Sequence, residues 1–188
     1  MFQKFPLALK VLVFCCSNLL AFSIAIWAFR QCASSNSWLV QVALLFILTW
    51  SLILGAFLFY QTFKYFRLPQ LYYHQLPFEN TAFFTSIGVQ HFRKILINSF
   101  FRHLNPRVYL RERSRREYLR FIEETKQSET SHLLSGLAAF IFQLLYLYQG
   151  DLFPFWVLGG FNLIFNLYPM LLQRSNRFRF LVKLDKFS

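Results

Sequence analysis

The residues best suited to chemistry stand just before the third hydrophobic run of the sequence. Glu124, Glu129 and His132 lie in a stretch without a helix breaker. On a helix, Glu124 and His132 share a face, and Glu129 precedes His132 by three residues, so a carboxylate and the imidazole are neighbours. A carboxylate there could orient the ring and raise its basicity, as a general base acting on a hydroxyl group requires. We therefore predict His132 as catalytic base, with Glu129 or Glu124 orienting it.

A second polar cluster closes the fourth hydrophobic run, and it consists of amides and arginines: Asn166, Gln173, Arg174, Asn176 and Arg177. In an antiparallel helical hairpin, the start of the first helix and the end of the second share one side of the membrane. We therefore expect the arginines to face the glutamates of the first cluster. The amides would add uncharged donors and acceptors.

Two other interpretations of these residues stay open: a structural role and a metal site. Charged residues that flank a membrane span are usually solvated, and an ion pair between helix ends could do no more than hold the hairpin together. Glu129 and His132 also form a Glu-x-x-His pair, half of a di-iron site. The second half is missing, and the three cysteines show no metal-ligand spacing with the histidines, so we expect no metal and interpret the cysteines as packing residues.

Four hydrophobic runs must position these clusters. The sequence is 56% hydrophobic and 15% charged, more apolar than a soluble chain of 188 residues. The runs long enough to cross a bilayer as helices are Val11–Phe29, Trp38–Tyr60, Leu133–Tyr148 and Phe153–Leu172. Gly150 and its neighbours join the last two into a tight hairpin. The sequence thus predicts an all-α membrane protein with four transmembrane helices.

The distribution of basic residues predicts the orientation. Of 20 Lys and Arg residues, twelve lie between Lys64 and Lys126 and five between Arg174 and Lys186. Basic residues accumulate on the cytoplasmic side, so we expect both termini and the central segment to be cytoplasmic, in a bacterial cytoplasmic membrane. Because the bases follow the spans, we expect membrane contact and no nucleic-acid partner. The first span lacks a clean cleavage site and is expected to remain uncleaved.

The central segment is predicted to be helical. Thr81–Leu104 mixes aromatic and basic residues as an interfacial helix does, and Arg111–Lys126 reads as a charged helix that continues into the third span. The expected organisation is therefore an N-terminal membrane hairpin (1–60), a basic cytoplasmic interfacial segment (61–131), and a C-terminal membrane hairpin with a basic tail (132–188).

Three blocks of this sequence resemble the glycosyl-4,4'-diaponeurosporenoate acyltransferase family, bacterial membrane enzymes that acylate the sugar of a glycosylated carotenoid. The first block contains Phe78 and Glu79 followed by Gly88, Val89 and Leu96; Phe92 and Arg93 stand where the family usually has Trp and Lys. The second contains Glu124, Thr125, Lys126, Glu129 and His132. The third contains Asn166, Pro169, Gln173, Arg174, Asn176, Arg177 and Arg179.

This resemblance implies an acyltransferase that esterifies a sugar hydroxyl of a glycosylated carotenoid or terpenoid lipid, with a fatty acyl donor as co-substrate and no cofactor. Arg174 and Arg177 would then hold the donor's phosphate or stabilise the oxyanion. Asn166, Gln173 and Asn176 would bind sugar hydroxyls, and Lys126 joins the expected substrate-binding residues. The alternatives are a non-catalytic membrane scaffold and a metal-dependent lipid hydroxylase or desaturase.

Overall fold

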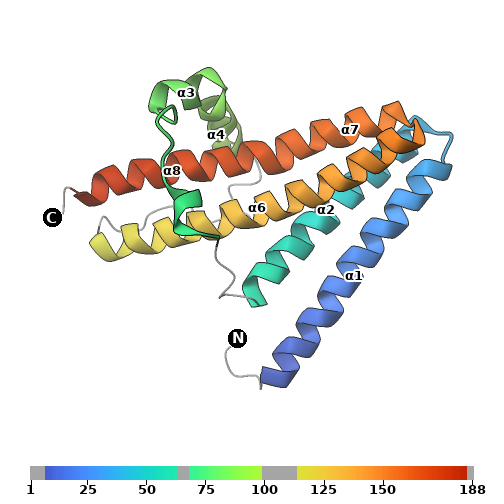
Figure 1. Cartoon of the computed structure of the whole chain (residues 1–188), viewed down its shortest axis with the longest axis horizontal. Helices are drawn as coiled ribbons and strands as arrows, with labels where there is room; N and C mark the ends of the chain where they lie inside the picture. The colour runs from blue at the N-terminus through green and yellow to red at the C-terminus, as the bar shows by residue number, and fades with distance from the viewer. Residues whose placement is uncertain (1–6, 63–67, 99–113, 186–188) are drawn as a thin grey trace. The chain divides into compact units, whose positions relative to one another are not determined.

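The computed structural model describes residues 7–62, 68–98 and 114–185, and no strand occurs within these ranges. Four helical stretches are long and apolar enough to cross a membrane: Leu12–Ser34, Trp38–Tyr60, Arg115–Gln149 and Leu152–Leu184. These stretches confirm the predicted all-α class with four candidate membrane spans. Figure 1 shows the helices in chain order, coloured from blue to red.

The chain divides into two compact units. The first unit comprises Met1–Arg67 with Ser131–Leu167, and the second comprises Leu68–Thr130 with Tyr168–Ser188. The three-part organisation expected from the sequence stays a prediction.

The first unit is built on two long apolar helices, α1 (Leu7–Ser34) and α2 (Trp38–Thr62). Small residues of α1 are buried in this unit: Ala21, Ala25, Ala28 and Cys32. They let the helix backbones approach closely, as in other membrane helix pairs. Large apolar side chains such as Leu19 and Trp156 are 67% and 70% exposed, which suits a surface in contact with lipid.

The hairpin predicted around Gly150 is present in the first unit, where α6 (Arg115–Gln149) is followed by α7 (Leu152–Asn162). Gly150 has φ = +80°, and the amide of Asp151 donates to the carbonyl of Tyr146 at 2.9 Å. Together with the Gly150 to Leu147 bond of 3.1 Å, this is a Schellman motif, which requires a left-handed residue that glycine adopts without strain. The two helices therefore run antiparallel, side by side in Figure 1.

A π-helical turn, η4 (Leu163–Leu167), follows α7 and leads into α8 (Tyr168–Leu184). Pro169 offers a local reason for the turn, because it has no N–H to donate to the carbonyl of Phe165 four residues earlier. Single π turns interrupt α-helices at functional sites more often than elsewhere. This one carries Asn166, one of the predicted site residues.

The second unit contains the first half of α6, all of α8 and three short helices. The short helices are η2 (Gln70–Tyr73), α3 (Thr81–Ser86) and α4 (Val89–Asn98). A small core of Phe84, Val89, Leu172 and Phe178 holds α3 and α4 against α8. The rings of Phe121 and Phe180, 4.4 Å apart between centroids, join α6 to α8.

The prediction of one continuous interfacial helix is wrong, because α3 ends at Ser86 and α4 begins at Val89. Gly88 breaks it with φ = +79°, a conformation that stops an α-helix and that side chains with a Cβ rarely adopt. Positions 99–104, the predicted end of that helix, lie outside the described residues. The charged helix is described from Arg115 onwards and continues without a break into the third span, as predicted.

Candidate functional site

A buried cluster of two carboxylates and two guanidiniums occupies the second unit. Helix α8 supplies Arg174 and Arg177, three residues apart on one face, and α6 supplies Glu129. Glu79 comes from the turn just before α3. Glu129 and Arg177 are 0% and 1% exposed. The two acids balance the two bases, as buried charges must be balanced to be tolerated.

Arg174 uses every donor it has. Its Nε and Nη2 atoms bond the two carboxylate oxygens of Glu79 at 2.6 and 2.7 Å, and its Nη1 atom bonds Glu129 Oε1 at 2.8 Å. The remaining two N–H groups reach the backbone carbonyls of Tyr72 at 3.0 Å and His74 at 3.1 Å. A guanidinium has five N–H groups. Arg174 therefore has no donor left for a substrate, which favours a positioning role.

Arg177 is bonded far less completely. Its Nη1 atom donates to Glu129 Oε2, and its Nη2 atom lies 3.4 Å from the carbonyl of Tyr73. Its Nε atom is buried and has no hydrogen-bond partner in the part of the chain that the structure describes. The guanidinium carbon lies 5.3 Å from the ring centroids of both Tyr73 and Phe178, so aromatic faces hold its plane. Of the two arginines, Arg177 is therefore the one whose Nε–H donor could bind a substrate.

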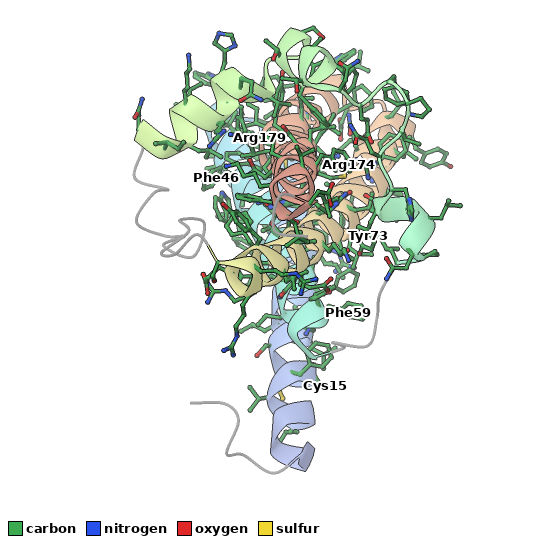
Figure 2. All side chains as sticks on the ribbon, turned by 90° about the vertical axis from the view of Figure 1, so that its left-hand side faces the viewer. Cys15, Phe46, Phe59, Tyr73, Arg174 and Arg179 are labelled. Atoms are coloured by element: carbon green, nitrogen blue, oxygen red, sulfur yellow. The ribbon has the colours of Figure 1, made fainter. Side chains whose placement is uncertain are left out.

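The short helix η2 also contributes to this cluster, and its residue Tyr73 lies below Arg174 in Figure 2. The hydroxyl of Tyr73 lies 2.5 Å from Thr130 Oγ1, and the Thr130 hydroxyl itself donates to the carbonyl of Lys126 at 2.9 Å. Because the threonine proton is used, Tyr73 is the donor. Burial raises the pKa of both Tyr72 and Tyr73 above the ordinary phenol value, so both stay neutral.

A separate network of amides and a hydroxyl lies in the first unit, between α6 and the turn after α7. Ser135 Oγ lies 2.5 Å from Asn166 Oδ1. The Asn166 amide donates to Asn162 Oδ1 at 2.9 Å, and the Asn162 amide donates to the carbonyl of Gly136 at 3.1 Å. The helices approach closely here, since a Cβ added to Gly136 would stand 3.3 Å from both Asn162 Oδ1 and Asn166 Cβ. The network thus fixes the position of Asn166.

His132 belongs to the same unit. Its imidazole lies against the side chain of Asn166 and the backbone of Phe165, the residue whose carbonyl Pro169 cannot engage. Its Nδ1 atom is buried and has no hydrogen-bond partner within residues 7–62, 68–98 and 114–185. A buried polar nitrogen without a protein partner calls for an explanation, and a substrate group is a candidate for that partner.

Two buried side-chain polar atoms lack a partner among the residues that the structure describes, and both belong to residues predicted as functional. They are His132 Nδ1 in the first unit and Arg177 Nε in the second. Buried polar groups are nearly always hydrogen-bonded, so each exception calls for an explanation. A substrate group is the explanation that the sequence prediction already supplies for both.

The remaining predicted residues lie in more ordinary surroundings. Glu124 is partly exposed and forms an ion pair with Arg120, 3.7 Å between Oε1 and Nε, on the charged turn of α6. Lys126 pairs with Glu123 at 2.8 Å and lies 5.7 Å from the centre of the Tyr73 ring. Asn176 is buried and Gln173 partly buried, both on α8. The arginines thus face Glu129, one of the two glutamates predicted, and not Glu124.

Both oxygens of Glu129 are occupied by guanidiniums. Its place in the structure therefore fits a counter-ion for two arginines better than the orienting partner of an imidazole. Asn166, predicted to bind substrate, is the side chain that touches His132.

Sequence reasoning missed Glu79, Tyr72, Tyr73 and Thr130 as members of the cluster. Glu79 belongs to a resemblance block but has no predicted role, although it is the only acidic residue among the first 111 positions of the sequence. The tyrosines contribute through backbone carbonyls as well as rings, and a carbonyl leaves no trace in a sequence.

Within residues 7–62, 68–98 and 114–185, no group of three or more His, Cys, Asp or Glu residues is placed to hold a metal ion.

The model of the family described as glycosyl-4,4'-diaponeurosporenoate acyltransferase matches residues 69–186, which begin after α2 and include both polar groups described above. No curated protein and no solved structure matches the chain.

Proposed function

We propose that this chain, which belongs to the glycosyl-4,4'-diaponeurosporenoate acyltransferase family, esterifies a sugar hydroxyl of a glycosylated carotenoid or related terpenoid lipid with a fatty acyl group. The family match covers more than half of the chain, and its name describes an acyltransferase acting on a glycosylated carotenoid. The four apolar helices suit a lipid acceptor, because polyene and acyl chains are soluble only in an apolar environment.

The observation that carries this proposal is the buried, unpartnered Nδ1 atom of His132. As general base, it takes the proton of the sugar hydroxyl while the oxygen attacks the acyl carbonyl carbon. The imidazolium then returns the proton to the leaving group of the donor. The Asn166 side chain, held by Ser135 and Asn162, keeps the ring in position.

Arg177 is the proposed electrostatic partner of the reaction, because its Nε–H is buried and unused. A donor of this kind stabilises an acyl oxyanion or holds a sugar oxygen. Arg174, Glu79 and Glu129 fix the guanidinium of Arg177 and do not contact the substrate. Asn176, Gln173 and Lys126 stay proposed substrate-binding residues, and Glu124 a proposed orienting residue of the charged turn.

The proposed reaction uses the acyl donor as co-substrate and needs no further cofactor. The proposed setting is the bacterial cytoplasmic membrane, with both termini and the basic central segment on the cytoplasmic side. The basic residues between the second and third apolar helices support this orientation.

The test is production of the acylated lipid in a host that supplies the glycosylated carotenoid, measured by mass spectrometry of lipid extracts. We expect wild-type protein to yield the ester and His132→Ala or His132→Gln to reduce it by a factor of about 100 or more, in the range of general base catalysis. His91→Ala is the matched control, since His91 is exposed on α4. An His132 variant with full ester and normal protein level would favour the scaffold alternative.

A further inference from the structure

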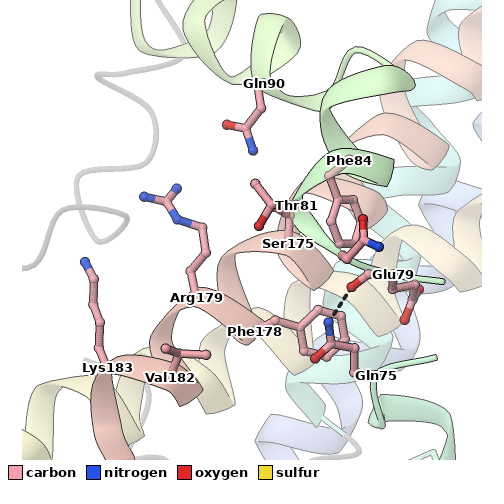
Figure 3. A pocket seen from close by; sticks show the side chains of 11 residues that line it. Gln75, Glu79, Thr81, Phe84, Gln90, Ser175, Phe178, Arg179, Val182 and Lys183 are labelled. Carbon is pink, nitrogen blue, oxygen red and sulfur yellow. Dashed lines mark hydrogen bonds between the residues drawn. The ribbon is translucent and has the colours of Figure 1, made fainter. Parts of the chain in front are cut away.

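A pocket of about 360 Å³ opens in the second unit, between α8 and the segment that carries α3 and α4. Figure 3 shows Arg179 and Lys183 projecting from α8 on one side and Gln90 of α4 on the other. The volume falls in the range of small-molecule sites. Nothing in the proposed chemistry of His132 or Arg177 uses this pocket.

The walls of this pocket combine hydrogen-bonding side chains with the apolar side chains of Phe84, Phe178 and Val182. Three amide side chains contribute, from Gln75, Asn80 and Gln90, and two hydroxyls, from Thr81 and Ser175. Such groups bind oxygen atoms of a ligand without selecting for its charge. The charge preference must come from the ionised residues.

The ionised residues favour an anion. Arg179 and Lys183 are four residues apart on α8 and therefore lie on one helix face. Neither forms an ion pair with another residue of the described ranges. The single acid at the wall is Glu79, and both its carboxylate oxygens are engaged by Arg174. The pocket consequently carries two uncompensated positive charges beside neutral donors.

We propose that this pocket binds the phosphate groups of the acyl donor. An Arg beside a Lys, with amides and hydroxyls around them, is suited to phosphate oxygens, because the guanidinium bonds two of them at once and the ammonium acts as a point charge. A neutral sugar could accept hydrogen bonds from the two cations but would leave their charges without a counter-ion. The donor class is thus a phosphate-bearing acyl carrier, either a soluble acyl thioester of coenzyme A or a phospholipid.

This inference rests on the proposed acyl transfer for its chemistry. The sugar oxygen forms a bond to the acyl carbonyl carbon, while the C–S bond of a thioester, or the C–O bond of a phospholipid ester, breaks. The hydroxyl proton passes through the base to the departing thiolate or alkoxide. The phosphates remain on the leaving group, and the pocket holds them without taking part in bond changes.

The first experiment measures transfer by the full chain in vesicles of zwitterionic lipid containing the glycosylated acceptor. One arm supplies labelled acyl-coenzyme A, and the other supplies a labelled phospholipid without coenzyme A. The double variant Arg179→Gln/Lys183→Gln is expected to raise KM for the donor that works by a factor of about 10 or more, with kcat nearly unchanged. The arm that yields ester identifies the source of the phosphate.

The matched control is Lys94→Gln/Arg116→Gln, which removes two exposed cations from α4 and α6 outside the pocket. It is expected to leave KM within a factor of about two. Arg179→Lys, which keeps the charge, should recover part of the lost affinity. An unchanged KM in the double variant, or an equal rise in the control, would overturn the proposal.

A second measurement separates failure of this proposal from failure of the proposed function. Binding of coenzyme A and of a short-chain phosphatidic acid to the purified chain is measured without any acceptor. Loss of binding in Arg179→Gln/Lys183→Gln alone supports the phosphate pocket even if no ester forms. Binding of neither probe, or equal binding by wild type and the double variant, contradicts it even if ester forms.

Discussion

Arg174 and Glu79 form a buried bidentate ion pair in the second unit, with Nε 2.6 Å from Oε1 and Nη2 2.7 Å from Oε2. The pair joins α8 to the turn before α3, across 95 positions of the chain. Both carboxylate oxygens of Glu79 are thereby occupied by the guanidinium of Arg174. The pair therefore organises the second unit and leaves the chemistry to other residues.

Removing Glu79 should destabilise the protein more than removing an exposed acid. Glu79→Ala leaves the Arg174 guanidinium buried without its main partner, a loss of about 3 to 5 kcal/mol in the free energy of unfolding. Glu123→Gln is the control, because that side chain is 52% exposed in a surface ion pair and should cost about 1 kcal/mol at most. Thermal unfolding in detergent measures both. Equal melting temperatures for the two variants would contradict the assignment.

Substitutions of the two arginines should differ in their effects, one mainly on stability and the other mainly on activity. Arg174→Lys loses most of five hydrogen bonds, whereas Arg177→Lys keeps a charge near Glu129 and loses the Nε donor that has no protein partner. We expect Arg174→Lys to lower the melting temperature strongly. Arg177→Lys should keep most of the fold and reduce ester formation by a factor of about 10 or more. A greater loss of stability in Arg177→Lys would reverse the two roles.

Tyr73 should make the protein sensitive to alkaline pH. Burial raises its pKa above the ordinary value of 10.0, so the contribution to stability is complete below that value. As pH rises further, the phenol of the unfolded chain ionises first, and stability falls until the folded protein ionises as well. Tyr73→Phe should lose about 1 kcal/mol near neutral pH, from the bond to Thr130, and decline less above pH 10. Melting temperatures against pH test this, and parallel curves for both proteins would refute it.

Gly136 and Gly160 form a matched pair in the first unit. A Cβ at Gly136 would stand 3.3 Å from Asn162 Oδ1 and from Asn166 Cβ, whereas a Cβ at Gly160 would meet no atom within 4 Å. Gly136→Ala should therefore displace the amide network, cost about 1 kcal/mol and lower ester formation. Gly160→Ala should be neutral or stabilising by up to about 1 kcal/mol, through helix propensity. Comparable activity in both variants would show that the network does not position the imidazole.

The sequence was most informative where the physical cause is local. Long apolar runs become helices that can cross a membrane whatever they pack against, and Gly150 closes a hairpin through its own φ angle. The same locality explains the error over the interfacial helix. Composition made Thr81–Leu104 look continuous, while the backbone conformation of one residue, Gly88, divides it.

Partners of opposite charge were predictable, but their assignment was not. Spacing and hairpin geometry brought Arg174 and Arg177 towards the glutamates of α6, and both bond Glu129. Nothing in the sequence distinguished the two arginines. Their difference depends on Glu79 and on the carbonyls of Tyr72 and His74, which lie 95 to 102 positions away from Arg174 in the chain.

The sequence by itself determined the four apolar helices, the hairpin and the set of polar residues that could do chemistry. Only the tertiary structure decided which of those residues are already satisfied, Arg174 and Glu129, and which retain a free polar atom, His132 and Arg177. The physical reason is that hydrophobicity and helix-breaking are properties of short segments. The saturation of a donor or acceptor depends on every group that folding brings within about 3 Å of it.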